Sequence, residues 1–194
     1  MSTPSRTDAL PPVEADVLAL AYDFSGIATL VNLGGVEDSH AVAILQANPG
    51  MRGVFIEEPH KAETSRKRLL AGGVLNRCDI IAAEPREALL AEADACLLSA
   101  FHRFTDADAA VLLHRCRSGM PARGRILIIE MFVADRAPGT APENDPPLLA
   151  STAAGRFRTL DETEALLREE GFHPTRFVPL DEALGLLEAR PEGA

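Results

Sequence analysis

Residues 28–57, ATLVNLGGVEDSHAVAILQANPGMRGVFIE, decide the fold. They open with a nearly continuous apolar run, ATLVNL (28–33), which is typical of a strand buried on both faces. Gly34-Gly35 ends this run, residues 39–47 carry a helical pattern, and GVFIE (53–57) is a second strand-like run. A strand, a helix and another strand in this order predict a β-α-β unit and therefore a parallel sheet.

The same alternation continues on both sides of this unit. Further strands are expected at 78–83, 94–100, 125–133, 175–180 and 184–189, of which RILIIEMFV (125–133) is the strongest. Helices are expected at 14–23, 60–71, 86–91, 106–119 and 160–170, and residues 135–150 have the composition of a loop. The pattern predicts one α/β domain over residues 14–191, preceded by a disordered, Pro-rich tail at 1–13.

Composition limits the classes of partner. The 194 residues carry a formal net charge of −10, which argues against nucleic acid and anionic membranes as main partners. The first residues lack the apolar core of a secretory signal, and the three cysteines have no CxxC spacing. We therefore expect a cytoplasmic protein with reduced thiols and no metal site.

Five phrases in a fixed order carry a family resemblance: AYDFSG (21–26), LVNLGG (30–35), Glu57 to His60, RCRSGMPARGRILIIE (115–130) and GRFRTLDETEALLREEGF (155–172). The chain resembles the catalytic domain of class I S-adenosylmethionine-dependent O-methyltransferases of the plant-type and bacterial small-molecule group. The resemblance implies a Rossmann-like, doubly wound sheet of seven strands whose last strand is antiparallel. It also implies small-molecule substrates of secondary metabolism and an N-terminal dimerisation domain, which we expect to be absent here.

The resemblance places a cofactor site after the first strands. Asn32 stands where the family has an acid, and Gly34 and Gly35 begin its glycine loop, but Val36 and Asp38 replace two further glycines. Val36 resists positive φ, and Glu37 and Asp38 add charge near the expected position of the cofactor's own carboxylate. Two such charges about 4 Å apart repel by about 4 kcal/mol at an effective dielectric of about 20.

Two other acids match cofactor positions of the family. Glu57, at the end of the second strand, matches the acid that binds the ribose hydroxyls, and Glu84 matches the acid near the adenine. A carboxylate accepts hydrogen bonds from both ribose hydroxyls, so the chemistry is suitable. Each glutamate is equally well explained as a solvated strand end.

His102 matches the family's general base, in the phrase Phe101-His102-Arg103-Phe104. A histidine of near-neutral pKa suits the deprotonation of an acceptor hydroxyl. The neighbouring acid of the family is Arg103 here, and Phe157 stands in place of the glutamate that orients the base. His102 is therefore expected to lack an orienting acid, and a loop histidine without a catalytic role is the alternative. The remaining histidines, among them His40, are expected at the surface.

These departures favour a degenerate methyltransferase-like protein. We expect S-adenosylmethionine binding to be impaired, and the chain to act as a non-catalytic or repurposed subunit beside a full-length relative. The alternative is a working, truncated O-methyltransferase that acts on a small-molecule hydroxyl. Apolar residues on the leading helix (Val17, Leu18, Leu20) and at Leu148-Leu149 predict an oligomer of like or mixed subunits.

Overall fold

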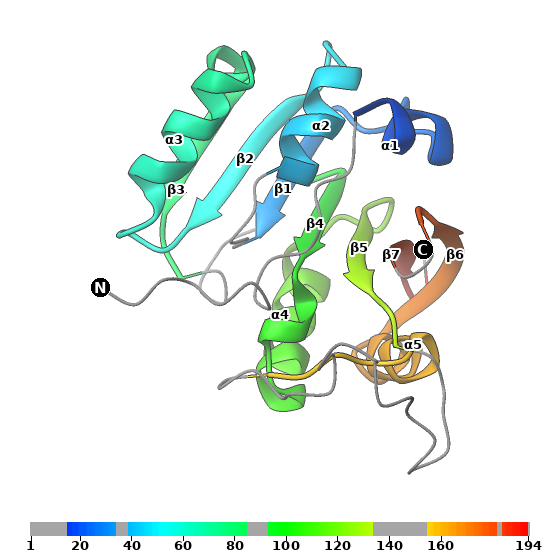
Figure 1. Ribbon diagram of the computed structural model, residues 1–194. Helices are drawn as coiled ribbons and strands as arrows, with labels where there is room; N and C mark the ends of the chain where they lie inside the picture. Colours follow the sequence, from blue (N-terminus) through cyan, green and yellow to red (C-terminus); the bar gives the residue numbers. More distant parts are fainter. Residues whose placement is uncertain (1–14, 34–38, 85–92, 134–154, 182–183, 194) are drawn as a thin grey trace, which may run out of the picture.

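The computed structural model describes residues 15–33, 39–84, 93–133, 155–181 and 184–193. These ranges form a seven-stranded sheet in the order β3-β2-β1-β4-β5-β7-β6, with helices on both faces (Figure 1). The strands are β1 (Thr29–Leu33), β2 (Arg52–Glu57), β3 (Cys78–Ala82), β4 (Ala95–Ser99), β5 (Arg125–Met131), β6 (Phe172–Pro179) and β7 (Leu184–Pro191). The helices are α1 (Ala15–Ala21), α2 (Ser39–Ala47), α3 (Ala62–Ala71), α4 (Asp106–Gly119) and α5 (Leu160–Glu169), with short 3-10 helices η1 (Leu75–Arg77) and η3 (Phe101–Arg103).

The sheet is doubly wound. Strands β1 to β5 run parallel, and β7 pairs antiparallel with both β5 and β6. The strand order reverses between β1 and β4, and this confirms the predicted class I methyltransferase topology. Strand β6 begins at Phe172, earlier than predicted, because Gly171 (φ +77°) turns the chain directly out of α5. The predicted tail (1–13), the helix at 86–91 and the loop at 135–150 lie outside the described residues.

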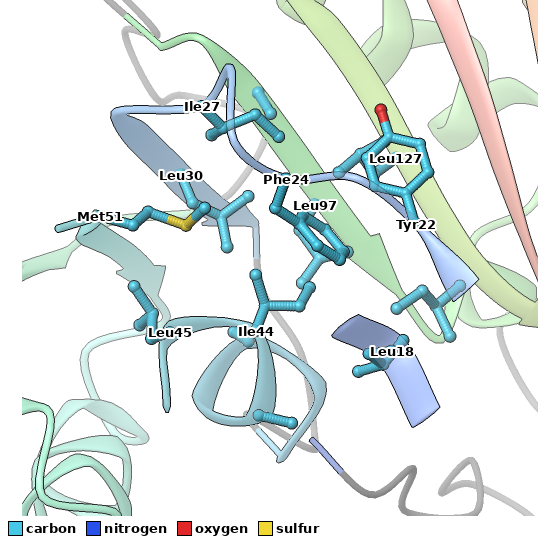
Figure 2. Close-up of a cluster of buried hydrophobic side chains, with 14 of the residues drawn as sticks. Leu18, Tyr22, Phe24, Ile27, Leu30, Ile44, Leu45, Met51, Leu97 and Leu127 are labelled. Carbon is cyan, nitrogen blue, oxygen red and sulfur yellow. The ribbon is translucent and has the colours of Figure 1, made fainter. Parts of the chain in front are cut away.

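Alternate residues of each central strand point to opposite faces, so the sheet carries two apolar layers. On one face α1 and α2 pack through Leu18 and Ile44 against strand residues such as Leu30 and Leu97 (Figure 2). Leu69 of α3 belongs to the same apolar cluster. On the other face α4 and α5 cover Val31, Leu98 and Ile128, mainly through Leu112, Leu113, Cys116 and Leu167. Nearly continuous apolar strands are therefore required, as the sequence indicated. Among the helices of the described ranges, none is long and apolar enough to cross a membrane.

A buried polar network joins the segment after α1 to the antiparallel edge. The Tyr22 hydroxyl donates to Glu188 Oε2 on β7 at 2.5 Å and accepts from Arg125 Nη1 on β5 at 3.0 Å. Arg190 Nε donates to the other Glu188 oxygen at 2.9 Å. Burial, followed by the hydrogen bond to Glu188, raises the pKa of Tyr22 to about 12. The network fixes the beginning of the domain against strands near its end.

Replacing Tyr22 with Phe tests this network, since the ring and its edge contact with Phe24 are kept. We expect the free energy of unfolding at pH 7 to fall by about 1–3 kcal/mol, because a buried hydrogen bond to a charged group is lost. Between pH 10, the ordinary pKa of tyrosine, and about pH 12, the raised pKa of Tyr22, the hydroxyl keeps its proton in the folded chain but loses it in the unfolded chain. The stability advantage of the wild type is therefore complete below pH 10 and shrinks above it, by about 1.4 kcal/mol per pH unit.

Urea unfolding of both proteins at pH 7, 9 and 11 measures this difference. Tyr22 is the single tyrosine of a chain without tryptophan, so absorbance near 295 nm reports its ionisation alone. A titration midpoint near pH 10 in the folded protein would contradict the prediction.

Candidate functional site

Polar side chains gather where the parallel strands end, because their carboxyl ends share one edge of the sheet. Asn32 in β1 is 1% exposed, Glu57 at the end of β2 is 0% exposed, and Glu130 in β5 is 2% exposed. Glu84 lies just beyond β3 and is partly exposed. Gly34 and Gly35 lie outside the described residues, as do Val36 to Asp38. The described part of the predicted cofactor site is thus an edge with two buried polar side chains on β1 and β2, and a buried acid lies on β5, beyond the intervening β4.

His102 lies on η3, directly after β4, and is oriented by Glu130. Its Nδ1 lies 3.0 and 2.9 Å from the two carboxylate oxygens, and its backbone N–H donates to Glu130 Oε2 at 2.8 Å. The backbone N–H of Met131 donates to the other oxygen at 2.8 Å. With a carboxylate facing Nδ1, that nitrogen carries the proton and Nε2 has a free lone pair. The expectation that His102 lacks an orienting acid is therefore wrong.

Phe157 has a different role from the acid it replaces. Its ring stacks on the His102 imidazole with centroids 4.2 Å apart and planes inclined by 14°. His102 Nε2 is buried and has no hydrogen-bond partner among the described residues. A buried ring nitrogen that is left unpaired is costly, unless a ligand completes it. Phe157 and Glu130 together hold the ring so that Nε2 is the atom available to an acceptor.

Arg158 fixes the backbone on both sides of His102. Its buried guanidinium donates to the carbonyl oxygens of Phe104 at 2.9 Å and Phe101 at 3.4 Å, and lies 5.1 Å from the centre of the Phe101 ring. The chain enters η3 through Ala100 in the left-handed region (φ +61°), a conformation that needs support when the residue is not glycine. Gly155 lies so close to the carbonyl of His102 that a Cβ there would come within 2.3 Å.

Arg158, bound to the carbonyl oxygens of Phe101 and Phe104, forms a clamp around η3. Charged residues connect the beginnings of α4 and α5 to this clamp. Asp106 accepts from Arg158 Nε at 2.9 Å and Nη2 at 2.7 Å, and Arg156 links Asp106 to Glu162. Burial raises the pKa of Asp106, but the hydrogen bonds from Arg158 and Arg156 outweigh it and lower the pKa overall. Thr159 and Glu162 form a capping box that starts α5, as the phrase TLDE permits. The segment 155–159 is thereby held over η3.

One other histidine belongs to this edge. His40, in the first turn of α2, is 0% exposed, and its Nδ1 lies 3.3 Å from Ser99 Oγ at the end of β4. The expectation of a surface position is wrong for His40, because its side of α2 packs onto the sheet. His60, His114 and His173 are exposed, as predicted. No cluster of side chains suited to a metal occurs in the described ranges.

Glu57 is suited to bind the two hydroxyl groups of a cofactor's ribose. Its carboxylate is buried at the carboxyl end of β2, and it offers only acceptor atoms. An open hollow of about 520 Å³ lies instead at the opposite edge, between Phe24–Ala28, Ala47–Met51 and Asp94. That hollow does not contact His102 or Glu57, so it does not belong to this site.

Comparison with known proteins agrees with this geometry. Residues 9–173 match the profile of the O-methyltransferase domain. The chain is 31% identical over 180 residues to a phenazine O-methyltransferase of Lysobacter antibioticus, and 35% over 167 residues to the mitomycin biosynthesis 6-O-methyltransferase of Streptomyces lavendulae. These alignments cover 88% and 86% of this chain but only 50% and 48% of the relatives, so the chain spans about half their length.

Solved structures agree as well. The mitomycin 7-O-methyltransferase superimposes with a TM-score of 0.80 at 31% identity, over 91% of this chain and 52% of that protein. An O-methyltransferase from neocarzinostatin biosynthesis, solved with S-adenosyl-L-homocysteine and 1,4-dihydroxy-2-naphthoic acid, gives 0.76 at 25% identity, over 89% of this chain and 52% of that protein. The fold, the strand-edge site and the domain match together show that this chain belongs to the S-adenosylmethionine-dependent O-methyltransferases of class I.

Proposed function

We propose that this chain binds S-adenosylmethionine and methylates a hydroxyl group of a small molecule of secondary metabolism. The observation that carries the proposal is His102, oriented by Glu130 and presenting a buried Nε2 without a partner among the described residues. Relatives with matching sequence act in phenazine and mitomycin biosynthesis, which supports the class of substrate.

The chain's own residues would handle the proton. His102 Nε2 accepts it from the acceptor hydroxyl as that oxygen attacks, and the nearby Glu130 carboxylate stabilises the imidazolium that forms. S-adenosylmethionine, when bound, supplies a methyl group on a positively charged sulfur. Phe157 excludes water from one face of the imidazole, so the transferred proton stays on the ring.

Cofactor binding would rest on the edge formed by β1 to β3. Glu57 is placed to accept both ribose hydroxyls, Glu84 lies at the end of the next strand, and Asn32 offers a neutral amide beside the first loop. None of these three roles depends on the residues that replace the family's glycines.

A second function is favoured by the loop sequence. Val36, Glu37 and Asp38 depart from the glycine pattern, and a chain that cannot bind the cofactor would serve as a non-catalytic subunit beside a full-length relative. Three expected departures from the family lie behind this alternative: the altered glycine loop, the missing orienting acid and the absent N-terminal dimerisation domain. Glu130 removes only the second of them, because it orients His102.

Calorimetric titration with S-adenosylhomocysteine separates the two functions. We expect saturable micromolar binding, and Glu57→Gln should weaken it about 10- to 100-fold, because hydrogen bonds to a charged acceptor are lost. Glu63→Gln, on the exposed surface of α3, serves as the charge-matched control and should bind normally. Folded protein that gives no heat at millimolar ligand would favour the non-catalytic subunit.

Transfer of labelled methyl from S-adenosylmethionine to a panel of aromatic hydroxyl compounds tests the base. His102→Ala should lower kcat about 100-fold or more, which is the usual contribution of a general base. The same variant should bind S-adenosylhomocysteine as tightly as the wild type. Glu130→Gln should also lower kcat, since an amide stabilises the imidazolium poorly. Equal rates in wild type and His102→Ala would assign His102 a purely structural role; His114→Ala, exposed on α4, is the control.

We further propose that the chain associates with itself or with a relative through α1. Leu18 is buried, but Val17 is 41% and Leu20 is 89% exposed on this helix. Exposed apolar groups of this kind favour an interface. Leu148 and Leu149, which share the expectation, lie outside the described residues.

Light scattering across a concentration series tests association. Leu20→Asp should shift the protein towards monomer, whereas Leu70→Asp, at a leucine 66% exposed on α3, should not. A wild-type protein that stays monomeric at every concentration would refute self-association.

A further inference from the structure

Arg103 is a cation that follows the proposed base in the chain, and none of the described residues is a close partner of its charge. It follows His102 in η3 and is partly exposed. Its side chain makes no hydrogen bond, and no ion pair within 4 Å, to any residue in the described ranges. None of the described residues therefore holds the Arg103 guanidinium in a structural contact.

The neighbouring arginines are not available in this way. Arg158 is bound to Asp106 and to two carbonyls, and Arg156 is shared between Asp106 and Glu162. Their guanidinium groups serve the clamp around η3. Arg103 differs from both because no residue of the described ranges binds its side chain.

Glu58 is near enough to Arg103 for a weak electrostatic attraction, but its carboxylate is already bound by other residues. Lys61 donates a hydrogen bond to Glu58, and His60 Nδ1 lies 3.5 Å from its other oxygen. The hydrogen bond from Lys61 is the main reason that the pKa of Glu58 is lowered, and Arg103 adds a weaker attraction at longer range. Lys61 thus already neutralises Glu58, and Arg103 adds a second positive charge near this carboxylate.

The backbone that carries Arg103 is rigidly placed. The carbonyls of Phe101 and Phe104 on either side bind Arg158, and the Arg103 backbone lies against Gly155, where a Cβ would come within 2.5 Å. The distance from the Arg103 backbone to His102 Nε2 is therefore set by the fold. Binding of a ligand by both residues therefore costs little conformational entropy of the backbone.

We propose that Arg103 binds a carboxylate of the acceptor, carried on the same ring system as the hydroxyl that faces His102. A guanidinium binds a carboxylate with two parallel hydrogen bonds, which orients a planar acceptor as well as attracting it. A monoanion is indicated rather than a phosphate dianion, since Glu57, Glu84 and Glu130 line the same edge of a chain with net charge −10. This inference rests on the proposed function and specifies its substrate class.

Matched pairs of ligands test the inference. Salicylate, 1-hydroxy-2-naphthoate and 3-hydroxy-2-naphthoate are each titrated beside the corresponding carboxamide, with and without saturating S-adenosylhomocysteine. We expect the carboxylate of at least one pair to bind about 10- to 100-fold more tightly than its amide. The preference should decrease as salt increases, because charge attraction is screened.

Variants assign the preference to one residue. Arg103→Gln should abolish it, and Arg103→Lys should keep part of it, since lysine holds the charge without the two-pronged geometry. Arg123→Gln removes one positive charge at an exposed site beside Asp94, at the opposite edge of the sheet, and should keep the full preference.

These titrations distinguish a failure of the proposed function from a failure of the inference about Arg103. S-adenosylhomocysteine that fails to bind contradicts the proposed function, while the titrations without it still measure the carboxylate preference. Carboxylates that bind no more tightly than their amides in every pair, or are not bound at all, overturn the inference about Arg103. A preference that persists in Arg103→Gln overturns it as well.

Discussion

The Glu130 carboxylate is the group on which the rest of the site depends. It is buried at the end of β5 and accepts from the backbone N–H groups of His102 and Met131, with His102 Nδ1 also within hydrogen-bond distance. A buried carboxylate is tolerated only when such donors replace its lost hydration. Two of these donors belong to one residue, so Glu130 fixes both the backbone and the ring of His102. The left-handed Ala100 and the Arg158 clamp follow from the need to bring η3 to this carboxylate.

Phe157 is best understood as a consequence of this arrangement. A second carboxylate at residue 157 would face the same imidazole as Glu130, and like charges so close repel each other in a buried site. An aromatic ring stacked at 4.2 Å removes that repulsion and still limits the rotation of His102. The loss of an acid at one position is therefore compatible with an oriented base, because orientation comes from β5.

The sequence was sufficient for the fold and for part of the site. Apolar runs such as ATLVNL and RILIIE are required by a sheet covered on both faces, so strand positions could be predicted directly. Glu130 was missed because it stands at the end of such a run and its partner lies 28 residues away in the chain. His40 was missed for a similar reason, since only the packing of α2 shows which side of that helix is buried. The roles of Arg158 and Phe157 depend on long-range contacts that spacing alone does not encode.

The charges at the strand edge affect whether a chain with this loop sequence can bind S-adenosylmethionine. The family's acid is Asn32 here, so one carboxylate is lost from β1, while Glu37 and Asp38 add two in the loop that follows. The amino-acid part of S-adenosylmethionine carries both an ammonium and a carboxylate. An acid in the loop attracts the first and repels the second, and these effects oppose each other at similar distances. The attraction therefore offsets part of the repulsion of about 4 kcal/mol that applies to each pair of like charges, and hydrogen bonds of about 1.5–3 kcal/mol each at a buried Glu57 offset a further part.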